Sequence, residues 1–322
     1  AAMVRHMTDA TRSPEEVHQV GLDEVERITS EMDAILSGEG YTEGSVGERM
    51  QRLNVEERFV YPNTAEGRAA LIADARAQIE GIKEVLPQWF ATRVNYPVEV
   101  RAVPEYSQDS APTGYYNPPA KDGSRPGVYW LNVRDTAVHP RFALPTLTYH
   151  ESIPGHHLHF ATAIDQDVPP LVTAIWSNAA GEGWALYSEQ LAAEMGMYDD
   201  DPYGDLGRLQ AELHRAVRLV VDTGMHAKKW SREQAIEYMI EAEGVEEGTA
   251  ISEVERYAVW PGQALGYKLG MLKILELREE AKQALGDDFD VRAFNDTVLH
   301  VASTPLPYIE ATVRDWIRQA DM

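Results

Sequence analysis

Apolar residues recur at helical spacing along most of this 322-residue chain. After Ser13 and Pro14, for example, apolar side chains return every three or four residues until Gly38. A serine followed by a proline is a typical helix start, because the hydroxyl caps free N–H groups and proline lacks one. The same spacing predicts further helices over the ranges 46–58, 63–86, 144–162, 172–195, 203–226, 231–243, 248–259, 263–285, 290–299 and 306–320.

One segment departs from helical spacing. Residues 97–103 alternate like a strand, and residues 127–133 form a second expected strand. Residues 106–126 lie between them and are rich in Pro, Gly, Ser and Asp, which predicts a loop. The expected fold class is therefore mainly α, with a small β-sheet or hairpin near residues 96–133. Because no repeat or Gly/Ser linker divides the chain, residues 1–322 are expected to form a single domain.

Composition excludes several classes of partner and site. The formal net charge of −23 disfavours nucleic acid and anionic membranes, since phosphate would be repelled. No apolar run is long enough for a membrane span. Cysteine is absent, so any metal must be held by His, Asp or Glu. No signal peptide is visible, which predicts a cytoplasmic location, although the opening Ala1-Ala2-Met3 suggests that the natural N-terminus lies elsewhere.

The segment from Tyr149 to His159 places four histidines and a glutamate within eleven residues. Zinc accepts neutral imidazoles and carboxylates as ligands, and zinc peptidases keep their general base directly after a ligand histidine. His150 is therefore the expected first ligand and Glu151 the expected base. His159 is expected to be structural.

The second ligand depends on the backbone around Pro154. This residue occupies the usual position four after His150 and cannot ligate. An ideal helix turns about 100° per residue, which would bring His157 to the face of His150. A turn widened at Pro154 and Gly155 would instead bring His156 there. We take His156 as the second ligand and keep His157 as the alternative.

A second motif, from Gly181 to Ala185, reads Gly-Glu-Gly-Trp-Ala. Its Glu182 supplies a carboxylate from a neighbouring helix, which completes a His₂Glu site for one Zn²⁺ and leaves a fourth position for water. The small residues of the motif allow the two helices to approach closely. Glu189 follows on the same helix face and is expected beside the ligands.

These motifs give the chain two resemblances. Broadly, it resembles the gluzincin metallopeptidases, in which a His-Glu helix is followed by a Gly-Glu-Gly-aromatic-Ala helix with a zinc-binding glutamate. Closely, it resembles the bacterial family called domain of unknown function 885. The motifs that match this family span His150 to His157, Gly181 to Ala185, Asp222 to His226, Pro261 to Gly270 and, more weakly, His18 to Leu22.

The resemblance covers nearly the whole chain and implies a helical, gluzincin-like metallopeptidase domain. Members of the family are usually much longer, with a helical N-terminal half before this segment. We therefore expect this chain to be the C-terminal half of a longer protein, and to self-associate where the missing half leaves apolar surface exposed.

Other polar residues are candidates for contact with substrate. Zinc peptidases need a donor to the oxyanion, and Tyr267 is the first candidate, with Tyr257 next. Arg256 precedes Tyr257 and is expected to contact substrate, and Tyr116 is expected to line the cleft. His226 is expected either to bind a substrate carbonyl or carboxylate, or to be structural.

The leading functional hypothesis is a zinc-dependent peptidase that acts on a peptide or small amide substrate. His150, His156 and Glu182 would hold zinc, and Glu151 would take the proton of the attacking water. The strand at 127–133 could align an extended peptide. Two alternatives stay open: a zinc hydrolase that cleaves non-peptide amides or esters, and a non-catalytic helical binding protein that contains a metal.

Overall fold

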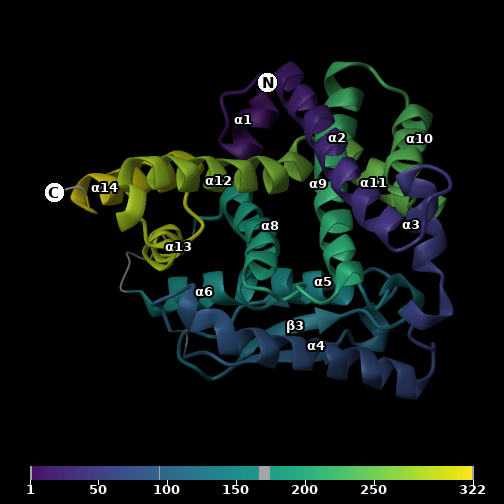
Figure 1. Cartoon of the computed structure of the whole chain (residues 1–322), viewed down its shortest axis with the longest axis horizontal. Helices are drawn as coiled ribbons and strands as arrows, with labels where there is room; N and C mark the ends of the chain where they lie inside the picture. Colours follow the sequence, from purple (N-terminus) through teal and green to yellow (C-terminus); the bar gives the residue numbers. More distant parts are fainter. Residues whose placement is uncertain (1, 94, 167–174, 321–322) are drawn as a thin grey trace.

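The computed structural model describes residues 2–93, 95–166 and 175–320. Its central feature is a pair of helices, α8 (Asn178–Glu194) and α9 (Pro202–Ala227), that stand between two layers (Figure 1). On one side α12 (Gly266–Leu285) crosses α8, and on the other lie α4 (Ala65–Val85) and a small sheet. The other α-helices of the described residues are α1 (Ala2–Thr8), α2 (Pro14–Gly38), α3 (Val46–Asn54), α5 (Leu144–Glu151), α6 (His156–Asp165), α10 (Arg232–Glu243), α11 (Glu247–Val259), α13 (Val291–Leu299) and α14 (Leu306–Ala320).

The helix starts follow local capping chemistry. Ser13, Ser45 and Ser231 each accept a backbone N–H three residues on, while the Glu or Gln at that position bonds back to the serine N–H. The fold is mainly helical, as expected. None of the described helices is long and apolar enough to cross a membrane.

Some expected helix boundaries differ from the structure. The helix α1 was not expected, because its sequence is short and polar. The helix expected over 46–58 ends at Asn54, and a short 3₁₀ turn follows. The helix expected over 172–195 begins at Asn178, where Ser177 caps it, and residues 172–174 of that range lie outside the described residues.

Two large apolar cores and a small third cluster, around Val17 and Leu219, hold the described parts of the chain together. One joins α4, the sheet, α5, α6 and α8 to α12–α14, and the other joins α2 and α3 to α9–α11. Where α2 lies along α9, a Cβ added to Gly21 would sit only 2.8 Å from the Leu219 Cβ, so glycine allows this close helix contact. The helices α5, α8 and α9 meet between the two cores, and the candidate site lies there.

The sheet has three strands in the order β1-β3-β2. The expected strands appear as β1 (Val98–Ala102) and β3 (Gly127–Leu131), which pair in parallel. The additional strand β2 (Gly114–Asn117) pairs antiparallel with β3, so part of the expected loop at 106–126 is an edge strand. This strand is only four residues long and is flanked by turn-forming residues, so its sequence alone does not favour a strand.

Candidate metal centre

The helix expected over 144–162 is two helices, α5 and α6, separated by residues 152–155. In the gap the Gly155 N–H donates to the Tyr149 carbonyl at 2.9 Å, six residues back instead of the usual four. The turn thus absorbs two extra residues, as the sequence predicted, but it interrupts the helix. A Cβ on Gly155 would lie 2.0 Å from the His150 carbonyl oxygen, so only glycine fits this turn.

The turn brings together three ligand-type side chains, those of His150, His156 and Glu182. Their ligand atoms lie within 4.8 Å of one another. Glu182 Oε2 is 3.6 Å from His150 Nε2 and 3.3 Å from His156 Nε2. Two ligand atoms bound to tetrahedral zinc at about 2.0–2.1 Å would be about 3.4 Å apart. Glu182 Oε2 is buried and has no hydrogen-bond partner among the described residues, so the cluster fits a zinc ion.

His157 lies away from this cluster. Its Nε2 is 3.0 Å from the Tyr96 carbonyl, which can only accept, so Nε2 carries the proton and donates. Its Nδ1 therefore accepts from the Tyr116 hydroxyl at 2.8 Å. Burial lowers the pKa of His157 to about 4, which keeps the ring neutral. Both ring nitrogens are engaged, and so His156, not His157, faces the other two candidate ligands.

Glu189 supports the cluster from α8. Its Oε1 accepts a hydrogen bond from His150 Nδ1 at 2.6 Å, which leaves His150 Nε2 to face Glu182. Burial alone would lower the pKa of His150, but Glu182 and Glu189 outweigh it and raise the pKa to about 9. Burial alone would raise the pKa of Glu182, but His156 and His150 hold it well below its ordinary value. The cluster therefore attracts positive charge.

Glu151 follows the first candidate ligand and lines the same cleft. Its side chain is almost fully buried. Burial raises the pKa of Glu151, against the opposing effect of the two neighbouring histidines. A carboxylate with a raised pKa is better matched to proton transfer near neutral pH.

The cleft in front of the cluster has a volume of about 1110 Å³. It lies between β2, α5, α6 and α8 on one side and α9, α11 and α12 on the other. The expected site residues that line it are Glu151, Tyr267, Arg256, Tyr116, His150, His156 and Glu182.

His226 and Tyr257 lie outside the described lining of this cleft. His226 is eleven residues beyond Arg215 on α9, which is about 16 Å along a helix axis. Its Nδ1 lies 2.9 Å from the Asp222 carbonyl, and Asp222 raises the pKa of His226. Tyr257 is fully buried and donates its hydroxyl proton to Glu253 at 2.7 Å. Neither residue is among the described residues that line the cleft, so their expected roles stay predictions.

Residues of the motifs at 181–185, 222–226 and 261–270 hold the site together through direct contacts. The Trp184 indole donates to the Pro154 carbonyl at 3.0 Å and so ties α8 to the turn between α5 and α6. A Cβ on Gly183 would lie 2.5 Å from the Gly270 Cα, so these two glycines let α8 and α12 cross closely. Asp222 accepts the Gly262 N–H at 2.8 Å and fixes the turn before α12.

Sequence reasoning missed several residues that line the cleft, notably Trp176, Trp260 and Glu253. The ring of Trp176 stacks on Phe160 and covers the small residue Gly181. Glu253 could have been found from the sequence, because it lies three residues before Arg256 on a helix face that also carries Thr249 and Ser252.

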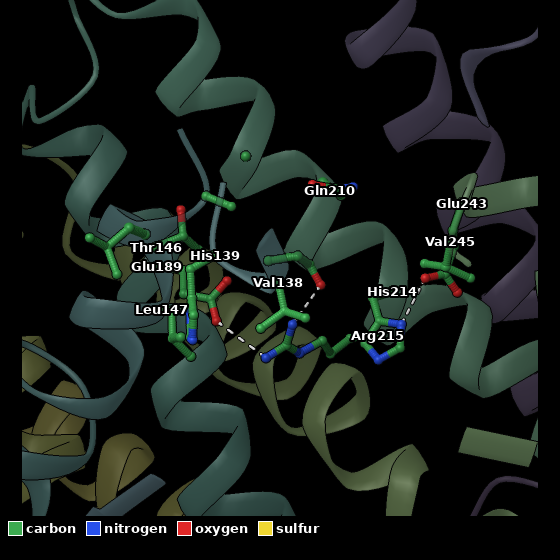
Figure 2. Close-up of a pocket in the computed structure, with 14 residues that line it drawn as sticks. Val138, His139, Thr146, Leu147, Glu189, Gln210, His214, Arg215, Glu243 and Val245 are labelled. Carbon is green, nitrogen blue, oxygen red and sulfur yellow. Dashed lines mark hydrogen bonds and ion pairs between the residues drawn. The ribbon is translucent and has the colours of Figure 1, made fainter. Parts of the chain in front are cut away.

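A second cavity, of about 260 Å³, lies on the other side of His214 and Arg215 (Figure 2). These two side chains and Leu147 line both cavities. Figure 2 shows His214 directed toward Glu243 and Arg215 toward Glu189. The wall between the cavities therefore includes two polar side chains of α9, each directed toward a carboxylate on a neighbouring helix.

Comparison with known proteins assigns the chain to a family. The family described as bacterial protein of unknown function (DUF885) matches residues 1–313. This chain belongs to the DUF885 family. No curated protein shows significant similarity to it.

Two solved structures share the fold of this DUF885 chain. One is described as a "putative lipoprotein" from Colwellia psychrerythraea, with 52% sequence identity and a TM-score of 0.97 over 99% of this chain. The other is described as a "putative lipoprotein of unknown function" from Shewanella oneidensis, with 23% identity and a TM-score of 0.82 over 96% of this chain, and it supports the fold alone. The chain spans 55% and 58% of the lengths of these two proteins.

The cytoplasmic location expected from the sequence is contradicted by this comparison. The Colwellia protein is described as a "putative lipoprotein", and lipoproteins are attached to the cell envelope. The expectation was wrong because it treated the lack of a visible signal peptide as informative.

Proposed function

We propose that this DUF885 chain is the catalytic part of a zinc-dependent peptidase. The observation that carries the proposal is the convergence of His150, His156 and Glu182 within 4.8 Å, with Glu151 beside them in an open cleft. A purely structural zinc site is usually closed by four protein ligands and needs no base. Three candidate ligands that face a cleft fit the open arrangement of hydrolytic zinc sites.

The side chains divide the chemistry among them. Zinc held by these three residues would supply Lewis acidity toward a carbonyl and a water molecule. Glu151 takes the proton of the attacking water and later delivers it to the leaving amine. Glu189 accepts the His150 Nδ1–H, so that His150 would offer Nε2 to a bound zinc ion. Tyr267 lines the cleft and is the remaining candidate donor to the oxyanion.

The strand β2 is the element best placed to align an extended substrate. The expected strand at 127–133 is the central strand β3, and its backbone already pairs on both sides. The strand β2 is at the edge of the sheet, and all its residues except Asn117 line the cleft. A peptide in the cleft could extend the sheet there by backbone hydrogen bonds.

The test combines metal analysis with peptide digestion. Protein purified without added metal should contain about one zinc per chain, and Glu182→Ala should lose it. The zinc-loaded protein should cleave members of a peptide library. Glu151→Gln should keep zinc and lose about 10²–10⁴-fold in turnover, because the amide cannot accept the proton. Full activity in Glu151→Gln would refute the proposed role of Glu151, and full zinc occupancy in Glu182→Ala would remove Glu182 from the site.

The comparison with the Colwellia protein also supports a location. We propose that the full-length protein is attached to the cell envelope, as the description of that relative as a lipoprotein suggests. Its substrates would then be peptides outside the cytoplasm.

A further inference from the structure

The wall of the cleft that α9 and α11 form carries an excess of positive charge in a strongly acidic chain. Arg215, Arg218 and Arg256 all line the cleft, and we call these three residues the arginine wall. They surround the ring of Tyr267. The guanidinium carbons of Arg218 and Arg215 lie 4.8 and 5.9 Å from its ring centre, and Arg256 Nη2 lies 3.4 Å from its hydroxyl.

Few carboxylates balance this wall. Arg218 and Arg256 share one carboxylate, that of Glu253, at 2.9 and 3.4 Å. The same carboxylate also lies 3.6 Å from His214 Nε2. His214 has a closer partner in Glu243, at 2.7 Å. One negative charge therefore serves the two guanidinium groups, and like charges gathered in a half-buried site favour an added anion.

Arg215 is the least satisfied member of the wall. Its nearest carboxylate is Glu189 at 3.9 Å, and Glu189 is already bonded to His150 at 2.6 Å (Figure 2). Its Nε is buried and has no hydrogen-bond partner among the described residues. A buried donor without a partner is costly, so a bound acceptor would be stabilising here.

The remaining carboxylates of the cleft lie elsewhere. Glu151 and Glu182 belong to the metal centre, and Asp109 pairs with Arg134 at 3.0 Å. Because Glu189 contacts both Arg215 and His150, the arginine wall begins directly beside the candidate metal centre. An extended peptide advances about 3.3–3.6 Å per residue, so a chain end shortly after the cleaved bond would reach Arg215.

We infer that the arginine wall binds the free C-terminal carboxylate of a peptide substrate, so that the enzyme removes short C-terminal pieces instead of cutting within long chains. This inference rests on the proposed peptidase function. A carboxylate can accept two parallel hydrogen bonds from a guanidinium group, and this geometry is specific as well as strong. An acidic side chain offers the same chemistry, so the test must separate the two sources.

The experiment compares one peptide with a free C-terminus and the same peptide with a C-terminal amide. Both are tested for cleavage by the zinc-loaded protein and, by calorimetry, for binding to the Glu151→Gln variant. Because hydrogen bonds to a charged carboxylate are strong, we expect the protein to bind the free acid at least about tenfold more tightly than the amide. A third peptide carries the C-terminal amide and a glutamate in place of a glutamine near its C-terminus. It tests whether an acidic side chain can replace the terminal carboxylate.

Variants assign the preference to residues. Arg215→Gln and Arg256→Gln should each bind the amide as the wild type does, and lose most of the preference for the acid. Arg256 is the more exposed of the two and provides a readout if Arg215→Gln does not fold. Arg232→Gln, an exposed change on α10 outside the cleft, is the control that should keep the preference.

The outcomes separate this inference from the peptidase proposal. Preferred binding of the acid without cleavage of any peptide would support the carboxylate site and refute the peptidase. Equal cleavage of acid and amide would support the peptidase and overturn the carboxylate site. Absence of binding by both forms would overturn it as well, and so would recovery of full preference by the amidated glutamate peptide.

Discussion

At the scale of single residues, the orientation of His150 depends on one hydrogen bond. The contact between His150 Nδ1 and Glu189 Oε1 fixes the ring and its tautomer. We expect Glu189→Gln to weaken zinc binding about 10- to 100-fold, because an amide holds the imidazole less well. Competition with a chromophoric chelator measures the affinity. The control is Glu194→Gln, because Glu194 is the last residue of the same helix and pairs with Arg278, not with the histidines. Equal affinity in Glu189→Gln and wild type would contradict this role.

Glu253 makes stability depend on pH. Burial alone would raise its pKa, but Arg218, His214 and Arg256 hold it well below its ordinary value of 4.5. The folded state therefore favours the ionised form. The stabilisation from Glu253 is present above about pH 4.5 and is lost as the pH falls below that value, when the unfolded chain takes up the proton first.

We therefore expect Glu253→Gln to change the pH profile of unfolding. At pH 7 the variant should lose about 3–5 kcal/mol of unfolding free energy, because the buried Arg218 loses its partner carboxylate and the partly exposed Arg256 loses one as well. Between pH 5 and pH 3 its unfolding free energy should fall less steeply than that of the wild type. Denaturant titrations across this range measure both effects. Parallel profiles for the two proteins would show that Glu253 does not titrate as proposed.

At the scale of elements, the short connection between α5 and α6 decides which histidine joins the cluster. Gly155 is packed against the backbone of Tyr149 and His150. A Cβ added at Gly155 would lie 2.0 Å from the His150 carbonyl oxygen. We expect Gly155→Ala to displace the turn, to cost about 1–3 kcal/mol of stability and to weaken zinc binding. Denaturant unfolding and metal affinity together measure this.

A glycine on α11 provides the matched control. A Cβ at Gly248 would meet nothing within 4 Å, and the residue is helical. Gly248→Ala should therefore stabilise the protein slightly, since alanine favours helix over glycine by about 1 kcal/mol. If Gly155→Ala behaved like Gly248→Ala, the turn would not be the element that positions His156.

Sequence reasoning found what residue type and local spacing can show. The cluster of histidines with Glu151 and Glu182 stands out by chemistry alone, and Pro154 signals a departure from helical geometry. The pairing of β2 with β3 depends on a distant segment, so a run of turn-forming residues hides it. The pairing of Tyr257 with Glu253 follows helical spacing, because the two residues lie four apart on α11, but the burial of Tyr257 depends on the elements packed against that helix.

At the scale of the whole molecule, the described cleft is wide and partly apolar. Trp176 and Trp260 line it and stay 46% and 59% exposed. The Colwellia relative is longer, since this chain spans 55% of its length. Additional chain packed over the cleft would exclude water and restrict the bound peptide, and both effects lower the barrier to reaction.

We therefore expect residues 1–322 to be a weaker peptidase than a version extended to the full length of the relatives. The two proteins are compared at equal zinc content on the same peptides, with kcat/KM as the measure. Zinc affinity should be similar in both, because the candidate ligands and Glu151 all lie between residues 150 and 182. A gain confined to kcat/KM would place the effect in the cleft and not in the metal centre. Equal kcat/KM values would show that residues 1–322 already form the complete catalytic cleft.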